Sequence, residues 1–393
     1  MRAGVWAVAV LLAACQQGAP PGPSTPAATA TAAAASPSPR PTAVPTASPT
    51  PEPTARPGVE ATAVGTLPES FRLVALETEI ADGFHTRLWL VDLNERRPPT
   101  IVAEWEGPAD PVGGLSVSDD GRSVLVAAAG PRSRVALYLL RPETGATIVL
   151  YQESDTVAVS ARISPDGQRF AFAKYPAQGG SDLGVWAGAA AGGELVRIAR
   201  PSTASTVPAM PLAFSIDSAW LAFTREADSG GSEVRLVPAT GGIETLIGPG
   251  DAVSWRRNPP QLLVAATTSV PSRAYAYDVD AGRATDVVTS GSALTVISSV
   301  QWHPALERFV YVESQGDRAN SGGIWIRNAD GTSPSRVDVG VGFVYDPRWS
   351  RDGTRLTAIG GGDDSVVPLL ELFSGRRIAV LCRRGGIPPA DCV

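Results

Sequence analysis

Between Leu67 and Cys382 the chain alternates short apolar runs with breaks rich in Gly, Asp, Ser and Pro. A clear example is ARISPDGQRFAFA, residues 161–173, in which two alternating runs flank the word S-P-D-G. Pro fixes φ near a turn value, Asp accepts hydrogen bonds from backbone N–H groups, and Gly adopts a positive φ. The word therefore predicts a tight turn between two antiparallel strands. Similar words in LSVSDDGRSVLVAA (115–128) and PRWSRDGTRLTAIG (347–360) indicate a repeat architecture.

Each repeat brings a large apolar residue and a polar residue to the start of its turn word, and the period is 41 to 51 residues. A second β-rich run follows the turn, a Gly/Asp/Ser-rich loop leads to a third, and a Gly-containing turn leads to a fourth. Four strands per unit, joined by hairpins, are typical of a β-propeller blade. The six apolar and polar pairs are Val117 and Ser118, Ile163 and Ser164, Phe214 and Ser215, Trp255 and Arg256, Trp302 and His303, and Trp349 and Ser350.

The stretch before the first of these pairs supplies most of one further unit. FRLVALE, RLWLVDLN and TIVAEW match the last three strands of the repeat, and the first strand is either Ala61–Thr66 or a segment from elsewhere. We therefore predict an all-β fold for residues 67–393, a β-propeller of four-stranded antiparallel blades. Seven blades are predicted, with six blades and a non-standard closure as the second choice.

The words ISPDGQRFAFA, WSRDGTRLTAIG and IWIRNADGT resemble the S-P-D-G repeats of TolB-like propellers, over roughly residues 70–382. That WD-repeat-like family includes bacterial envelope proteins and the propeller domains of prolyl oligopeptidase relatives. The resemblance implies the fold and leaves function open, because propellers serve as binding proteins, hydrolases, lyases and scaffolds. The segment before these repeats does not resemble the α/β domain that precedes the TolB propeller, so a role in the Tol system is not expected.

The N-terminus has the pattern of a processing signal over residues 1–14. One positive charge at Arg2 precedes an apolar run, Val5–Ala14, that is too short to span a bilayer. The word L-A-A-C resembles a bacterial lipobox, and this resemblance implies that Cys15 is acylated and anchors the protein to membrane lipid. The alternative is an ordinary secretory signal that happens to contain a cysteine. Residues 15–66 are rich in Pro, Ala, Thr and Ser without apolar periodicity, which predicts a disordered tether.

The chain contains 3 cysteines. If Cys15 is acylated, Cys382 and Cys392 remain as a pair in an oxidising, extracytoplasmic compartment, where disulfides persist. We expect these two to form a bridge, and two free thiols are the alternative.

Composition and charge narrow the function classes. The formal net charge of −6 argues against nucleic-acid binding, which needs a basic surface. The only two histidines are His85 and His303, and no G-x-S-x-G word provides a nucleophile, so a Ser-His-Asp hydrolase is not expected. No zinc motif is present, and the acidic loops at 227–233, 313–323 and 360–365 leave calcium open as a ligand. The repeated turn aspartates are predicted to be structural caps; they are Asp120, Asp166, Asp217 and Asp352.

Aromatic residues and a histidine without a repeat counterpart are the candidate ligand contacts, placed in loops at one face of the ring. These are Phe84, His85, Trp105, Phe343 and Tyr345. The predicted function is a lipid-anchored, extracytoplasmic propeller of the bacterial cell envelope that binds an envelope protein, peptide or glycan without catalysis. The alternative is a propeller lyase or hydrolase that uses carboxylates at the channel mouth, with or without calcium.

Overall fold

The structure is a computed structural model. The residues it describes are 73–80, 84–91, 100–106, 115–130, 134–141, 144–152, 156–176, 183–201, 209–228, 230–315, 323–337, 343–349, 353, 355–361, 366–371 and 377–382. They all belong to one unit of the chain; residues 7–57 belong to a second unit, in which no residue is described. The predicted signal peptide, Cys15, the predicted tether and Cys392 lie outside the described residues.

The described residues form 27 strands in seven antiparallel sheets, each a simple meander. The first sheet has three strands, β1 (Leu73–Ile80), β2 (Phe84–Val91) and β3 (Thr100–Glu106). The second sheet contains β4 (Leu115–Val117), β5 (Val124–Gly130), β6 (Arg134–Arg141) and β7 (Ala146–Gln152). The third contains β8 (Thr156–Ile163), β9 (Arg169–Pro176), β10 (Gly184–Ala189) and β11 (Val196–Ala199). The fourth contains β12 (Met210–Phe214), β13 (Trp220–Glu226), β14 (Ser232–Pro238) and β15 (Thr245–Pro249).

The remaining three sheets repeat the same order. The fifth contains β16 (Ala252–Arg256), β17 (Gln261–Ala266), β18 (Arg273–Asp278) and β19 (Arg283–Thr289). The sixth contains β20 (Thr295–Trp302), β21 (Arg308–Gln315), β22 (Gly323–Asn328) and β23 (Ser335–Val337). The seventh contains β24 (Phe343–Trp349), β25 (Arg355–Gly361), β26 (Val366–Glu371) and β27 (Arg377–Cys382). The described part of the chain contains no helix, so none there is long and apolar enough to cross a membrane.

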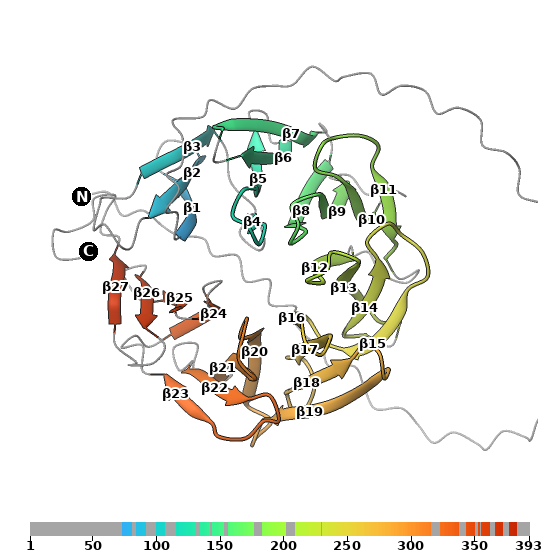
Figure 1. Ribbon diagram of the computed structural model, residues 1–393, viewed down its shortest axis with the longest axis vertical. Coiled ribbons are helices and arrows are strands. Elements are labelled where there is room, and N and C mark those ends of the chain that lie inside the picture. Colours follow the sequence, from blue (N-terminus) through green and yellow to red (C-terminus); the bar gives the residue numbers. More distant parts are fainter. Residues whose placement is uncertain are drawn as a thin grey trace, which may run out of the picture. The chain divides into compact units, whose positions relative to one another are not determined.

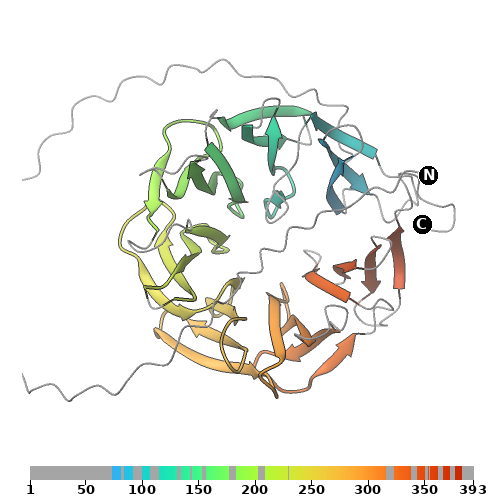
Figure 2. The same cartoon turned by 180° about the vertical axis from the view of Figure 1, so that it is seen from behind.

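The sheets are arranged as the blades of a propeller. In Figure 1 and, from behind, in Figure 2, the first strands of the four-stranded sheets lie nearest the centre and the fourth strands lie at the rim. Each four-stranded sheet contacts the next through its first strand, in the pairs β4 with β8, β8 with β12, β12 with β16, β16 with β20 and β20 with β24, and the first sheet contacts the second through β3 and β5. The predicted all-β propeller and the predicted seven blades are therefore confirmed. We number the blades one to seven in chain order.

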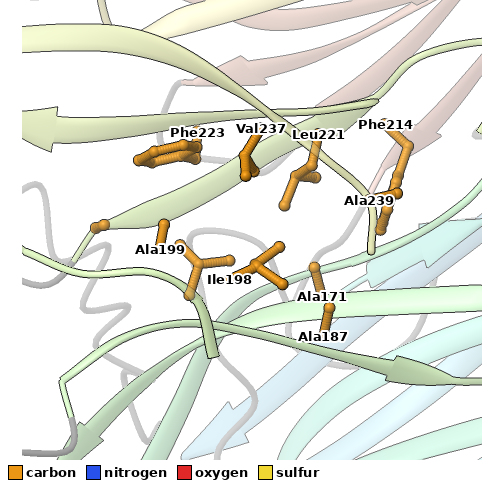
Figure 3. Packing of buried hydrophobic residues seen from close by; sticks show 11 residues of the cluster. Ala171, Ala187, Ile198, Ala199, Phe214, Leu221, Phe223, Val237 and Ala239 are labelled. Atoms are coloured by element: carbon orange, nitrogen blue, oxygen red, sulfur yellow. The ribbon is translucent and has the colours of Figure 1, made fainter. Parts of the chain in front are cut away.

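Apolar side chains fill the space between neighbouring blades. Six hydrophobic clusters join blade one to two, two to three, and so on to blade seven. Figure 3 shows the cluster between blades three and four, where Ile198 and Ala171 of one blade face Leu221, Phe223 and Val237 of the next. Phe223 is fully buried, and replacing such a side chain by Ala costs about 3–5 kcal/mol. Each blade is therefore stabilised mainly by the blades beside it.

Candidate functional site

The two ends of the ring differ in how they are built. The antiparallel order places the first-to-second and third-to-fourth connections of every blade at one end, which we call the turn end. The second-to-third connections and the links between blades lie at the other, the loop end. Turn-end connections are short and similar in length from blade to blade. Links between blades at the loop end vary in length: the link between blades four and five consists of residues 250–251, whereas the link between blades three and four consists of residues 200–209.

A hydrogen-bonded turn word closes blade three at the turn end. Ser164 Oγ donates to Asp166 Oδ1 at 2.5 Å, and the same carboxylate oxygen accepts from the Gln168 backbone N–H at 3.0 Å. Ser164 Oγ also accepts from the Arg169 N–H at 2.9 Å. Gly167 has a φ of 69°, and a Cβ there would approach Ser123 Oγ of blade two to 3.0 Å. The S-P-D-G word therefore supplies the polar partners that its own tight turn requires.

The same contacts recur in blades two and four. Ser118 and Ser215 donate to Asp120 and Asp217 at 2.6 and 2.5 Å. Partial burial raises the pKa of Asp120, but the hydrogen bonds from Ser118 and from the Arg122 N–H outweigh it and hold that pKa below its usual value. Asp166 shows the same balance of burial against its Ser164 and Gln168 hydrogen bonds, and its pKa is also lowered. Asp352, the fourth predicted cap, lies outside the described residues.

Neighbouring turns are also tied to one another. The Asp119 N–H donates to the Pro165 carbonyl at 2.9 Å, and the Asp166 N–H donates to Ser218 Oγ at 3.3 Å. Between blades six and seven the link is His303, whose Nε2 lies 3.0 Å from the Gly353 carbonyl oxygen. These contacts join successive blades at the turn end.

His303 replaces the serine of the turn word in blade six. Its Nδ1 accepts from the N–H groups of Ala305 and Leu306 at 3.1 and 2.8 Å, so Nε2 carries the proton that is donated to Gly353. Burial lowers the pKa of His303, and the ring is 5% exposed and packs edge-on against Trp349. The side chain therefore completes a turn, and both of its ring nitrogens are hydrogen-bonded to backbone groups.

The first strands are linked by a second series of hydrogen bonds. In three blades, a backbone N–H group near the end of the first strand donates to a side chain of the preceding blade. Ile163 N–H donates to Ser116 Oγ at 3.1 Å. Trp302 N–H donates to Ser254 Oγ at 2.8 Å, and Trp349 N–H donates to Gln301 Oε1 at 2.7 Å. Blade four has Ala213 at the acceptor position, and there Trp255 Nε1 donates to its carbonyl oxygen at 3.3 Å. Trp302 and Trp349 are 3% and 9% exposed, so both side chains belong to the core between blades.

The loop end carries a shallow hollow of about 480 Å³ on blade five. Its walls are Ser269, Val270, Pro271, Arg273, Asp286 and Thr289. Arg273 and Asp286 form an ion pair at 3.0 Å, and Val270 is 79% exposed beside it. The hollow therefore combines an exposed apolar side chain with a charged pair. Sequence reasoning missed it, because Arg273 and Asp286 are brought together by the pairing of β18 with β19.

A carboxylate with a raised pKa lies in the link between blades four and five. Asp251 links blades four and five, is partly buried, and accepts a hydrogen bond from the Thr267 hydroxyl. Burial raises the pKa of Asp251, against the opposing effect of the Thr267 bond.

A network of two arginines and two glutamates lies on blade four. Arg225 contacts Glu233 at 3.2 Å and Glu244 at 3.1 Å, while Arg235 contacts the same two glutamates at 2.6 and 3.7 Å. All four side chains are only 15–22% exposed. Because each charge has two partners of opposite sign, the network is better held than an isolated surface pair.

The predicted contact residues belong to strands, which corrects their expected place in loops. Phe84 and His85 begin β2, whereas Phe343 and Tyr345 lie at the start of β24. The backbone of all four therefore lies toward the loop end, and their side chains are outside the described part of the structure. They remain candidate contacts.

Trp105 requires a larger correction. It lies near the end of β3, is 6% exposed, and packs against Tyr138 of blade two with ring centroids 5.4 Å apart. Its role is to fill the space between blades one and two, so Trp105 is not a ligand contact.

Within the described residues, no group of three or more His, Cys, Asp or Glu side chains could hold a metal ion. The acidic loops that left calcium open as a ligand are described only in part, because residues 229, 316–322 and 362–365 are outside the described segments. Cys382 ends β27, and the position of its predicted partner Cys392 is not described.

No protein-family model and no curated protein matches this sequence. Solved structures do match. A prolyl endopeptidase is 12% identical with a TM-score of 0.57, over 80% of this chain and 50% of its own, so the match spans half of that enzyme. An oligogalacturonate lyase in complex with manganese is 14% identical with a TM-score of 0.51, over 77% of this chain and 83% of its own. TolB from Acinetobacter baumannii is 12% identical with a TM-score of 0.46, over 76% of each chain.

These matches bear on the fold. The chain is similar to TolB-like propellers, as its repeats predicted, and the two enzymes with the higher TM-scores share the propeller architecture. At 12–14% identity the likeness extends to architecture alone.

Proposed function

We propose that this chain is a lipid-anchored propeller of the bacterial cell envelope that binds an envelope protein, peptide or glycan at its loop end, without catalysis. The observation that carries the proposal is the difference between the two ends of the ring. At the turn end, the repeated Ser, Asp and His side chains are committed to hydrogen bonds within and between turns. At the loop end, connections vary in length and leave an exposed apolar residue beside a charged pair.

A rigid ring with variable loops at one end is the usual arrangement of a binding scaffold. The hollow on blade five is open to solvent, whereas the pockets that hold most small-molecule substrates enclose them. A macromolecular partner that spreads over several loops fits such a surface better than a deeply buried substrate does. Binding by Val270 and the Arg273–Asp286 pair would combine apolar contact with polar specificity.

The anchoring part of the proposal rests on Cys15 and the word L-A-A-C. It is tested by labelling growing cells with a fatty acid and comparing the wild type with Cys15→Ala and Cys392→Ala. Loss of label in Cys15→Ala alone supports the anchor. Equal incorporation in all three proteins contradicts it.

The binding part is tested by affinity capture from envelope extracts, with two matched variants. Val270→Glu alters the loop end, and Ile243→Glu alters a turn-end residue that is 88% exposed. We expect the first variant to lose the captured partner and the second to retain it. Equal capture by both variants contradicts a binding surface at the blade-five hollow.

The second candidate is a lyase, favoured by the structural likeness to an oligogalacturonate lyase that binds manganese. Incubation of the protein with oligogalacturonate, with and without manganese or calcium, tests it by the appearance of unsaturated product. Metal-dependent turnover would replace the binding proposal by the enzymatic one.

A further inference from the structure

The connection between β17 and β18 is anchored at both of its ends. This connection, residues 267–272, forms part of the wall of the blade-five hollow. At its start, the hydroxyl and the backbone N–H of Thr267 both donate to the Asp251 carboxylate. At its end, Ser272 is 2% exposed, and its Oγ accepts from the Ile297 N–H of blade six at 2.9 Å. The loop is therefore held by the link before blade five on one side and by blade six on the other.

Asp251 is itself fixed between blades four and five. Its backbone N–H donates to the Ala265 carbonyl of blade five at 2.9 Å. The preceding Gly250 N–H donates to the Ser232 carbonyl of blade four at 2.9 Å. A Cβ at Gly250 would overlap the Val264 side chain, so the backbone of this link lies directly against β17. The carboxylate therefore holds the loop from a position that is fixed on two blades.

We propose that Asp251 is the positioning residue of the binding surface at the loop end: its carboxylate holds residues 267–272 in the conformation that presents Val270 to a partner. Because this role concerns binding at the blade-five hollow, it rests on the proposed function. Val270 is 79% exposed, and its side chain would have to be ordered on binding if the loop were not anchored. A loop that is already ordered in the free protein does not lose that conformational entropy, so its affinity for a partner is higher.

The balance of forces at Asp251 supports a role beyond stability. Burial raises the pKa of its carboxyl group, although the hydrogen bonds from Thr267 oppose that effect. The charged carboxylate is therefore less stable here than in water, and it lowers the stability of the folded protein at neutral pH. Residues that hold a geometry at a cost in stability are typical of functional sites.

A second loop extends the same surface. The Ser290 N–H donates to the Ser272 carbonyl at 2.8 Å, so the link between blades five and six, residues 290–294, is bonded to the anchored loop. Leu294, in this link, is 61% exposed. Among the residues that the structure describes, Val270 and Leu294 are the large apolar side chains that are exposed at the loop end. The anchor therefore bears on a surface to which both side chains contribute.

Hydrogen exchange of the full chain, measured by mass spectrometry, tests the anchor. In Asp251→Ala we expect residues 267–270 to exchange about tenfold faster than in the wild type, because both hydrogen bonds of Thr267 to the carboxylate are lost. Asp251→Asn should restore the wild-type rate, since its amide accepts from the Thr267 N–H and donates to the Thr267 hydroxyl. Asp278→Ala is the matched control, because Asp278 accepts from the Ala281 N–H at 2.8 Å at the turn end of the same blade. It should leave exchange in residues 267–270 unchanged.

The other partner of the hydrogen bond provides a second pair of variants. Thr267→Val removes the hydroxyl and nearly retains the shape of the side chain, so exchange in residues 267–270 should again accelerate. Thr267→Ser retains the hydroxyl and should exchange as the wild type does. This pair keeps the test decisive if Asp251→Ala does not fold.

Affinity capture from envelope extracts tests the role in binding. The probe is the envelope protein that the wild type captures and Val270→Glu does not. We expect Asp251→Ala to capture about fivefold less of this protein, because its loop must be ordered on binding, and we expect Asp251→Asn and Asp278→Ala to capture as much as the wild type.

The two measurements separate failure of the positioning role from failure of the proposed function. Wild-type exchange of the loop in both Asp251→Ala and Thr267→Val would overturn the positioning role. Wild-type capture by a variant whose loop exchanges rapidly would overturn it as well, while the loss of capture in Val270→Glu would leave the binding surface in place. If no protein distinguishes the wild type from Val270→Glu, the proposed binding surface is wrong and the positioning role falls with it.

Discussion

Replacing His303 by Ser, the residue found at its position in blades two to four, tests how successive turns are linked. The substitution removes the Nε2–H donor to the Gly353 carbonyl and the packing of the imidazole on Trp349, whose ring centroid lies 4.8 Å away. One hydrogen bond contributes about 1 kcal/mol, and an aromatic contact about 0.5–1.5 kcal/mol. Serine also leaves one of the two N–H groups now bound by Nδ1 without an acceptor. We therefore expect a loss of about 2–3 kcal/mol in the free energy of unfolding at pH 7.

The pH dependence distinguishes this contribution from a simple packing defect. Burial lowers the pKa of His303 in the folded protein, while the unfolded chain has the ordinary value of about 6.5. The stabilisation is therefore present above pH 6.5 and is lost as the pH falls through the folded-state pKa, since the unfolded state then binds the proton more tightly. The difference between wild type and His303→Ser should shrink as the pH is lowered from about 7 to about 5.

Urea unfolding at a series of pH values measures both effects. His85→Ser, which changes the only other histidine, serves as the matched control and should retain the pH-dependent decrease attributed to His303. A His303→Ser protein that is as stable as the wild type, or that keeps the wild-type pH dependence, would refute this reasoning.

Three further substitutions test other parts of the ring. Asp166→Ala should lower the free energy of unfolding by about 1 kcal/mol at pH 7. Because the pKa of Asp166 is lowered in the folded protein, its contribution to stability is present above about pH 4 and is lost below it, so the difference from the wild type should disappear in acid. Chemical denaturation at several pH values measures this difference. Ser254→Ala removes the acceptor of the Trp302 N–H and should cost about 1–3 kcal/mol, whereas Ser290→Ala, at an exposed hydroxyl, should cost much less in the same assay. Asp251→Asn should raise the unfolding temperature at pH 7 and leave it unchanged near pH 3. Burial raises the pKa of Asp251, so the folded protein prefers the neutral form of this side chain. A lower unfolding temperature of the variant at pH 7 would contradict the direction of that pKa shift.

The repeat was predictable because its turns are local. The S-P-D-G word in residues 164–167 makes most of its hydrogen bonds within six residues, so its structure can be inferred from the chain itself. The β-rich run RFAFAK likewise predicted a strand, which is β9, and its residues from Phe170 to Lys174 are buried. Repetition of these local signals every 41 to 51 residues was enough to predict the propeller and its seven blades.

The candidate site was less predictable because it depends on contacts between strands and blades. The Arg273–Asp286 pair and the Arg225 network arise from strand register, which a single sequence specifies only weakly. Trp105 was mistaken for a loop residue because its packing partner, Tyr138, belongs to the next blade. Trp105 has no counterpart in the other repeats because it packs against Tyr138, and this packing does not indicate a ligand contact.

The assignment of binding to the loop end can be tested most directly in living cells. A photoreactive amino acid is placed either at Val270, which is 79% exposed at the loop end, or at Ile243, which is 88% exposed at the turn end. After irradiation, we expect a discrete cross-linked product from the Val270 position and none from the Ile243 position. Cross-linking to the same partner from Ile243 alone would contradict the central claim that the loop end is the binding surface.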